Sequence, residues 1–201
     1  GGATLSGAGD WTEEPKLVLN LRGERFELRQ EPQLIAEISP DLHFVLVPER
    51  LDLTGTVRVP YARIKVKELP RRSVALSPDV RLVETEEGQL RARASGRSQS
   101  FAINADVELL LGNDVYFNGF GITGGLTGGM RLRQSPDKGL EASGEVGLDK
   151  ESRYEAYGQR LKIRRGQLVF AGNIMQPGID IEAIRVVDDK TVGVRVEGRA
   201  N

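Results

Sequence analysis

The chain offers few side chains that could act as nucleophiles, general bases or metal ligands. It contains no cysteine, and His43 is its only histidine. Thiol chemistry, disulfides, thiolate metal sites and histidine-based triads are therefore excluded. His43 lies between Leu42 and Phe44 in an alternating run, on the opposite parity from both. We expect it to face solvent or to bridge to a neighbouring strand, not to act as a base.

One glycine motif formally matches a nucleotide-binding pattern. Gly119, Gly121 and Gly124 have the GxGxxG spacing of dinucleotide-binding loops. That motif works because a helix begins directly after the glycines and its N-terminus binds the pyrophosphate. Here residues 125–134 alternate and contain further glycines, so the sequence predicts a glycine-rich strand and no nucleotide site.

Carboxylates are abundant, but they do not form a recognisable site. The clusters Glu84–Glu87 and Asp188–Asp189 fall in predicted loops, where solvated charge is the usual role. The spacing of a calcium-binding loop is absent. We therefore predict no metal, no cofactor and no enzymatic activity.

Composition narrows the class of protein further. The 201 residues carry 28 basic and 29 acidic side chains, for a net charge of −1, which argues against a nucleic-acid partner. The hydrophobic content of 39% is too high for a typical disordered chain. No stretch reaches the roughly 18 consecutive apolar residues that a membrane helix needs.

The elements that position these residues are predicted to be strands. Apolar and polar residues alternate through most of the chain, which is the pattern of strands with one apolar face. Glycines and prolines interrupt most windows of helix length. Turns are predicted at Ser39–Asp41, Ser135–Asp137 and Arg165–Gly166. The alternating runs are Lys16–Arg22, Leu42–Val47, Leu51–Val59, Phe101–Leu111, Ile122–Leu132, Leu140–Leu148 and Val192–Val196.

One polar segment interrupts the alternation of apolar and polar residues. Residues 83–100 are charged and nearly free of large apolar side chains, which predicts a loop within one elongated β domain spanning 1–201. We expect 1–82 and 101–201 to belong to one continuous sheet. The Gly1-Gly2 start is typical of a remnant left by cloning, which predicts an excised fragment of a longer protein.

No amphipathic helix is predicted that could cover the apolar faces. These faces must therefore pack against each other in a sandwich or a barrel, or line an open trough. A trough with an open apolar lining needs a ligand, and acyl chains would suit side chains of Leu, Ile and Val. The basic residues on the polar faces are explained either by solubility and edge protection or by attraction to anionic lipid surfaces. They include Arg131, Arg133, Arg160, Lys162, Arg164, Arg195 and Arg199.

A run of spaced residues resembles a known family. Residues 154–172 read Tyr-x-Ala-Tyr-Gly-Gln, strand, Gly turn, strand and Gly, and Ile179–Arg185 reads Ile-x-Ile-x-Ala-x-Arg. This pattern resembles the TamB C-terminal domain family of Gram-negative bacteria. Upstream, residues 111–119 followed by Leu126-x-Gly128 resemble a strand pair of the same family. Gln176-Pro177 stands where the family more often has Asn-Pro. The chain stops at Asn201, before the terminal segment that the resemblance expects to engage an outer-membrane partner.

The resemblance implies a fold, a location and a function. The fold would be a β-taco, a single curled antiparallel-rich sheet that forms an open apolar trough with little or no helix. The full-length protein would be periplasmic, anchored in the inner membrane, and would reach the outer membrane. Like AsmA-like and bridge-like lipid-transfer proteins, it would shield acyl chains during phospholipid transport between the membranes. Alternatively, it would act as a scaffold for nascent strands of β-barrel proteins, together with TamA, an Omp85-type partner.

The predicted lining of the trough consists of the apolar-parity residues of the second half. They are Phe117, Ile122, Leu126, Met130, Leu132, Leu140, Val146, Leu148, Ile163, Phe170, Ile179, Ile181, Val192 and Val194.

Overall fold

A computed structural model of the chain describes residues 1–11, 15–66, 101–156, 158–188 and 190–199. These residues form strands connected by turns and contain no helix. The strands are β1 (Gly2–Asp10), β2 (Lys16–Glu24), β3 (Phe26–Gln30), β4 (Leu34–Val47), β5 (Arg50–Lys65), β6 (Ala102–Gly119), β7 (Ile122–Ser135), β8 (Gly139–Leu148), β9 (Arg153–Ala156), β10 (Gln159–Asn173), β11 (Gly178–Val187) and β12 (Lys190–Arg199).

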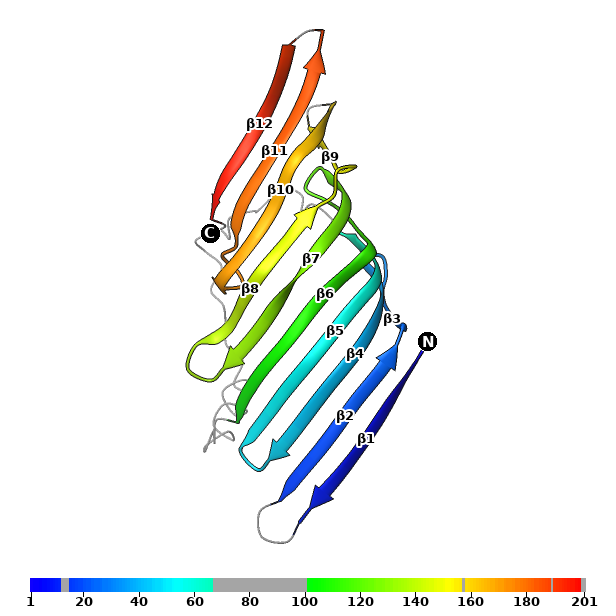
Figure 1. Cartoon of the computed structure of the whole chain (residues 1–201), viewed down its shortest axis with the longest axis vertical. Helices are drawn as coiled ribbons and strands as arrows, with labels where there is room; N and C mark the ends of the chain where they lie inside the picture. Colours follow the sequence, from blue (N-terminus) through cyan, green and yellow to red (C-terminus); the bar gives the residue numbers. More distant parts are fainter. Residues whose placement is uncertain (12–14, 67–100, 157, 189, 200–201) are drawn as a thin grey trace, which may run out of the picture.

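All of these strands belong to one mixed 12-stranded sheet. Its order is β1-β2-β4-β5-β6-β7-β8-β10-β11-β12, while β3 pairs with β4, and β9 pairs with β10 and β7. Figure 1 shows the strands stacked along the long axis, with β1 and β12 at opposite ends. The prediction of an all-β, antiparallel-rich single sheet is confirmed.

The pairing of β5 with β6 is parallel, unlike the other pairings, and it joins the two halves of the chain. Arg50 pairs with Ala102 and Lys65 with Asn118, so the two long strands run side by side over most of their length. The predicted loop at 83–100 lies outside the described residues, and the assignment of 1–201 to one domain stays a prediction. At the N-terminus, Gly2 is paired with Glu24 as part of β1.

A line of interruptions crosses the sheet, and we call it the crease. Arg25 separates β2 from β3, residues 149–152 separate β8 from β9, and the pairing register shifts around Ile38, Pro60 and Arg164. The β6–β7 register shifts at the same level, between Leu110 and Tyr116. Because each interruption lies opposite the next on the adjacent strand, the local bends that such irregularities produce add up.

Local chemistry explains several of these interruptions. Arg25 has a φ of 49°, and its backbone N–H donates to Ser39 Oγ at 3.1 Å. Pro60 has no N–H to offer to a neighbouring strand. Ser152 is fully buried, and a Cβ added to Gly124 would lie 1.8 Å from its Oγ, so only glycine fits there.

The core lies at the crease, on one face of the sheet. Ala36, Val59, Ala62 and Val115 form a buried cluster. Val59 comes before the crease on β5 and Ala62 after it, so side chains from both flanks pack together. Leu34, Ile38, Val57, Ile64, Leu109, Leu111 and Leu126 pack around this cluster. The face of the sheet that carries these residues is therefore on the inside of the bend.

The structure corrects two predicted turns. Ser39–Asp41 lies inside β4, and Arg165–Gly166 lies inside β10, so neither ends a strand. Both are at or next to the crease, where the chain bends without leaving the sheet. The predicted turn at Ser135–Asp137 is confirmed, since it connects β7 to β8.

Candidate functional site

The pairing register defines an apolar face that extends over the whole sheet. Directly paired residues lie on the same face, and faces alternate along each strand. Leu126 on β7 pairs with Leu148 on β8, and Leu109 on β6 pairs with Met130 on β7. The other neighbouring strands pair apolar residues in the same way. Following these pairs from β1 to β12 places the buried cluster and the successive apolar residues of each strand on one face. We call it the apolar face, and the opposite one the polar face.

The register brings all of the residues predicted to line a trough onto the apolar face. They differ in burial. Val146 and Ile163 are buried at the crease, whereas Leu140, Val192 and Val194 are exposed and the others are half-buried. Val146 and Ile163 therefore contribute mainly to packing. Contact of the remaining residues with a ligand stays a prediction.

The predicted lining omitted the first half of the chain, which contributes equally to the apolar face. Leu17 pairs with Leu46, Leu19 with Phe44, and Phe44 with Leu53. The signal was present in the sequence, because Lys16–Arg22 shows the same alternation. What the sequence does not show is that these strands join the others in one sheet.

Charge is almost absent from the apolar face. Among the paired positions of the described strands, its charged side chains are Arg185, opposite Val192 on β12, and Lys190, opposite Val187. The uncharged polar side chains at such positions are Gln30, Gln134, Tyr154 and Gln159. Away from these two cations, the face can contact hydrocarbon without the cost of desolvating ions.

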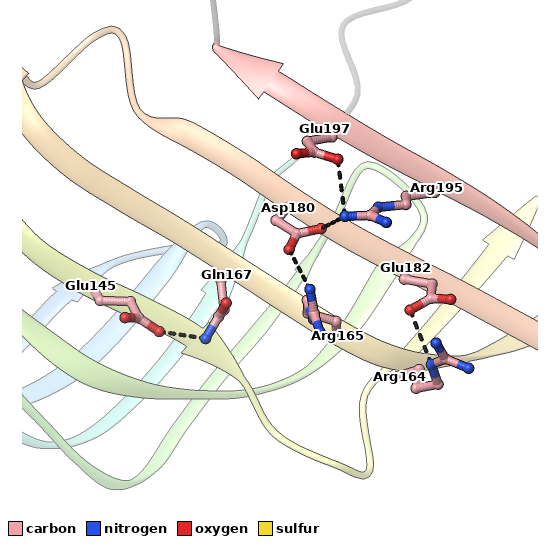
Figure 2. Close-up of polar contacts among 8 residues, drawn as sticks. All are labelled: Glu145, Arg164, Arg165, Gln167, Asp180, Glu182, Arg195 and Glu197. Carbon is pink, nitrogen blue, oxygen red and sulfur yellow. Dashed lines mark hydrogen bonds and ion pairs between the residues drawn. The ribbon is translucent and has the colours of Figure 1, made fainter.

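The polar face carries the ion pairs given by the structure. Figure 2 shows a series of contacts from β8 to β12 in which Asp180 lies between Arg165 at 3.1 Å and Arg195 at 3.7 Å. Arg195 also contacts Glu197 at 2.9 Å. Figure 2 further shows Arg164 with Glu182 at 3.0 Å and Gln167 with Glu145 at 2.7 Å. These contacts connect the edge strand β12 to the interior of the sheet through polar groups on one face.

Most of the arginines predicted on polar faces are paired in this way. Arg131 and Arg133 both approach Asp106, and Arg160 lies 3.6 Å from Glu155. Such pairing favours a structural role for them over attraction to an anionic surface. His43 also lies on the polar face, with Nδ1 at 2.7 Å from Asn20 Oδ1 on β2, which confirms the predicted bridge between strands.

Acid should weaken this face. A hydrogen bond from the Arg131 guanidinium holds the pKa of the Asp106 carboxyl below its ordinary value of 3.8. Because the folded-state pKa is the lower one, the contribution to stability is present above pH 3.8 and is lost as the pH falls through the folded pKa. Asp106→Asn should lower stability at pH 7 by less than about 1 kcal/mol, since exposed pairs are screened. Thermal melts should show the stability difference between wild type and variant narrowing as the pH falls below the ordinary pKa of 3.8. A constant gap would contradict this assignment.

Other kinds of site are not found in the described part of the chain. It contains no cluster of carboxylates and histidine suited to a metal ion. It also contains no helix long and apolar enough to cross a membrane.

Comparison with known proteins agrees with this architecture. The sequence profile of a protein family, described as the TamB C-terminal domain, matches residues 1–201 of the chain. The chain is also 33% identical, over 202 residues, to the translocation and assembly module subunit TamB of Haemophilus influenzae. The chain belongs to the TamB C-terminal domain family. The resemblance seen in the sequence is thereby confirmed.

This TamB domain covers only part of its relative. The match includes 95% of the chain but 15% of the Haemophilus protein. That protein is named as a subunit of a translocation and assembly module, and the name gives no catalytic activity. The absence of enzymatic activity in the present TamB domain stays a prediction.

Proposed function

We propose that the apolar face holds the acyl chains of phospholipids and shields them from water. In this proposal the full-length protein is anchored in the inner membrane, crosses the periplasm and supports outer-membrane biogenesis by moving phospholipid between the membranes. The family membership and the name of the Haemophilus relative, a translocation and assembly module subunit, support an envelope role.

The observation that carries the proposal is an apolar face that is both nearly free of charge and uncovered. Leu5 on β1 is 63% exposed, Leu140 on β8 is 42% exposed and Val196 on β12 is 52% exposed. All three lie on the apolar face, at positions spread over the length of the sheet. Apolar patches of this extent are rarely left in contact with water, because each exposed Å² costs about 25 cal/mol relative to burial.

Hydrocarbon chains suit this face better than a folded protein surface would. The side chains are mainly aliphatic, with a few phenylalanines and few hydrogen-bonding groups among them, so they cannot orient a polar partner. Acyl chains need only a dry apolar surface, and they adapt to the mixture of Leu, Ile, Val and Gly on the strands.

A second function is favoured by a different observation. Neither β1 nor β12 has a neighbour on its outer side among the described strands, so both edges present free N–H and C=O groups. Such edges could pair with nascent strands of outer-membrane β-barrel proteins, as in other cases of strand addition. In this alternative the protein would act with TamA, an Omp85-type partner.

Lipid extraction tests the first proposal. The chain would be directed to the periplasm of a Gram-negative host and purified without detergent, and its organic extract would be analysed by mass spectrometry. We expect phospholipid in amounts comparable to the protein. A soluble all-β protein of similar size, purified in parallel, provides the background. Phospholipid at the background level would refute the proposal, and cross-linking of the edge strands to unfolded barrel proteins would then favour the scaffold.

A further inference from the structure

We infer that Arg185 and Lys190 form a site for a phosphate group at one rim of the apolar face. The ligand would be a phospholipid whose phosphate binds these two cations while its acyl chains lie along β11 and β12. This inference deepens the proposed function and rests on it.

The placement of the two cations is the first observation. Both charged side chains at paired positions of the apolar face are basic, and both lie at the same end of one hairpin, close to the β11–β12 turn at the top of Figure 1. Arg185 pairs with Val192, so Lys190 is its diagonal neighbour across the two strands. Diagonal neighbours on one face are about 7–8 Å apart, which long side chains span easily. A single phosphate can therefore reach both groups.

The second observation is that neither cation is neutralised by a described residue. Arg185 and Lys190 are exposed, and neither takes part in the ion pairs found among the described residues of this hairpin. The carboxylates of the same hairpin, Asp180, Glu182 and Glu197, lie on the opposite face and bind arginines there. Asp188 lies in the connecting turn, outside the pairing of the two strands. Within the described ranges, no carboxylate pairs with the guanidinium or the ammonium group, and guanidinium geometry suits phosphate oxygens.

The third observation is the path that leads away from the site. On β11 the apolar face continues from Arg185 through Ala183 and Ile181 to Ile179, and β12 provides Val194 beside it. The seven residues Ile179–Arg185 are separated by six rises of about 3.3 Å, so this stretch of strand spans about 20 Å. That is longer than half of the roughly 30 Å hydrocarbon core of a bilayer, which is the depth that one leaflet's acyl chains occupy. A lipid with its phosphate at Arg185 would therefore find apolar contacts along its whole acyl length.

A competition experiment separates this site from the general apolar face. The purified chain would be incubated with vesicles that contain phosphatidylglycerol and diacylglycerol with identical acyl chains, then reisolated. Mass spectrometry would give the total bound lipid and the ratio of phospholipid to diacylglycerol. In the Arg185→Gln/Lys190→Gln double variant we expect this ratio to fall about fivefold, because charge-assisted contacts to the phosphate are lost. Total bound lipid should remain similar, since the acyl contacts are unchanged.

Arg199→Gln is the control for the loss of positive charge as such, because it removes one cation from β12 on the polar face, where Arg199 is opposite Gly178. The ratio should not change in this variant. An unchanged ratio in the double variant, or an equal fall in Arg199→Gln, would overturn the phosphate site while leaving acyl binding intact. Absence of any bound lipid in the wild type would overturn the proposed function and this site together.

Excess inorganic phosphate distinguishes a headgroup from a free anion. We expect it to leave the lipid ratio of the wild type unchanged, because the acyl chains hold the phosphate of the lipid at the site. If inorganic phosphate lowers the ratio to that of the double variant, the two residues form a site for free phosphate and the headgroup assignment is overturned.

Discussion

Replacing Val115 with aspartate should lower the free energy of unfolding by about 3–5 kcal/mol. Val115 is 2% exposed and belongs to the buried cluster at the crease. Its neighbours there are apolar, so an aspartate would lose its hydration without gaining a partner. Urea unfolding followed by circular dichroism measures the effect.

The matched control is Val186→Asp. Val186 is 64% exposed and lies on the polar face of β11, opposite Thr191. The same substitution there should change stability by less than about 1 kcal/mol, because the carboxylate stays in water. Similar losses in the two variants would show that the crease is not the core of this domain.

Charges on the open part of the apolar face should abolish lipid binding without unfolding the chain. Leu140 and Val196 are half-exposed on this face, so an aspartate at either position can reach water. An acyl chain lying across it would have to desolvate that charge, which costs several kcal/mol. We expect the Leu140→Asp/Val196→Asp double variant to carry at least about tenfold less phospholipid, since each 1.4 kcal/mol is a factor of ten.

Polar-face substitutions on the same strands control for the added charge. Ser143→Asp on β8 and Thr191→Asp on β12 add the same carboxylate on the opposite side of the sheet. Their lipid content should match the wild type, and circular dichroism should give the same strand signal for all variants. If the apolar-face variants unfold, the face is a closed dry core. If they bind lipid normally, acyl chains do not lie there.

The substitution at Val115 and the double substitution at Leu140 and Val196 probe different parts of the same apolar face. At the crease, small residues such as Ala36 and Ala62 allow the two flanks to approach, and burial there provides stability. Away from the crease, Leu140 and Val196 remain uncovered. A single face can therefore hold the fold together at its centre and still offer hydrocarbon contacts towards its rims.

The sequence by itself specified which side chains share a face. Alternation is a local property, since successive side chains on a strand point to opposite sides, and it assigned Leu126, Leu148 and His43 to the faces that the pairing register gives them. Glycine and proline spacing excluded long helices for an equally local reason. The absence of cysteine and the single histidine excluded whole classes of chemistry. These conclusions needed no knowledge of which strands are neighbours.

Pairing between distant strands determined the rest. The parallel contact of β5 with β6 and the alignment of interruptions into a crease depend on the register between distant segments, which alternation does not encode. For this reason Ser39–Asp41 resembled a turn in sequence but continues β4 through a bend. For the same reason Val146 and Ile163 are buried while Val194, with the same parity signal, is exposed. Only the pairing of β11 with β12 makes Arg185 and Lys190 neighbours on an apolar face, because a residue's face and its diagonal partner are set by hydrogen bonds to another strand.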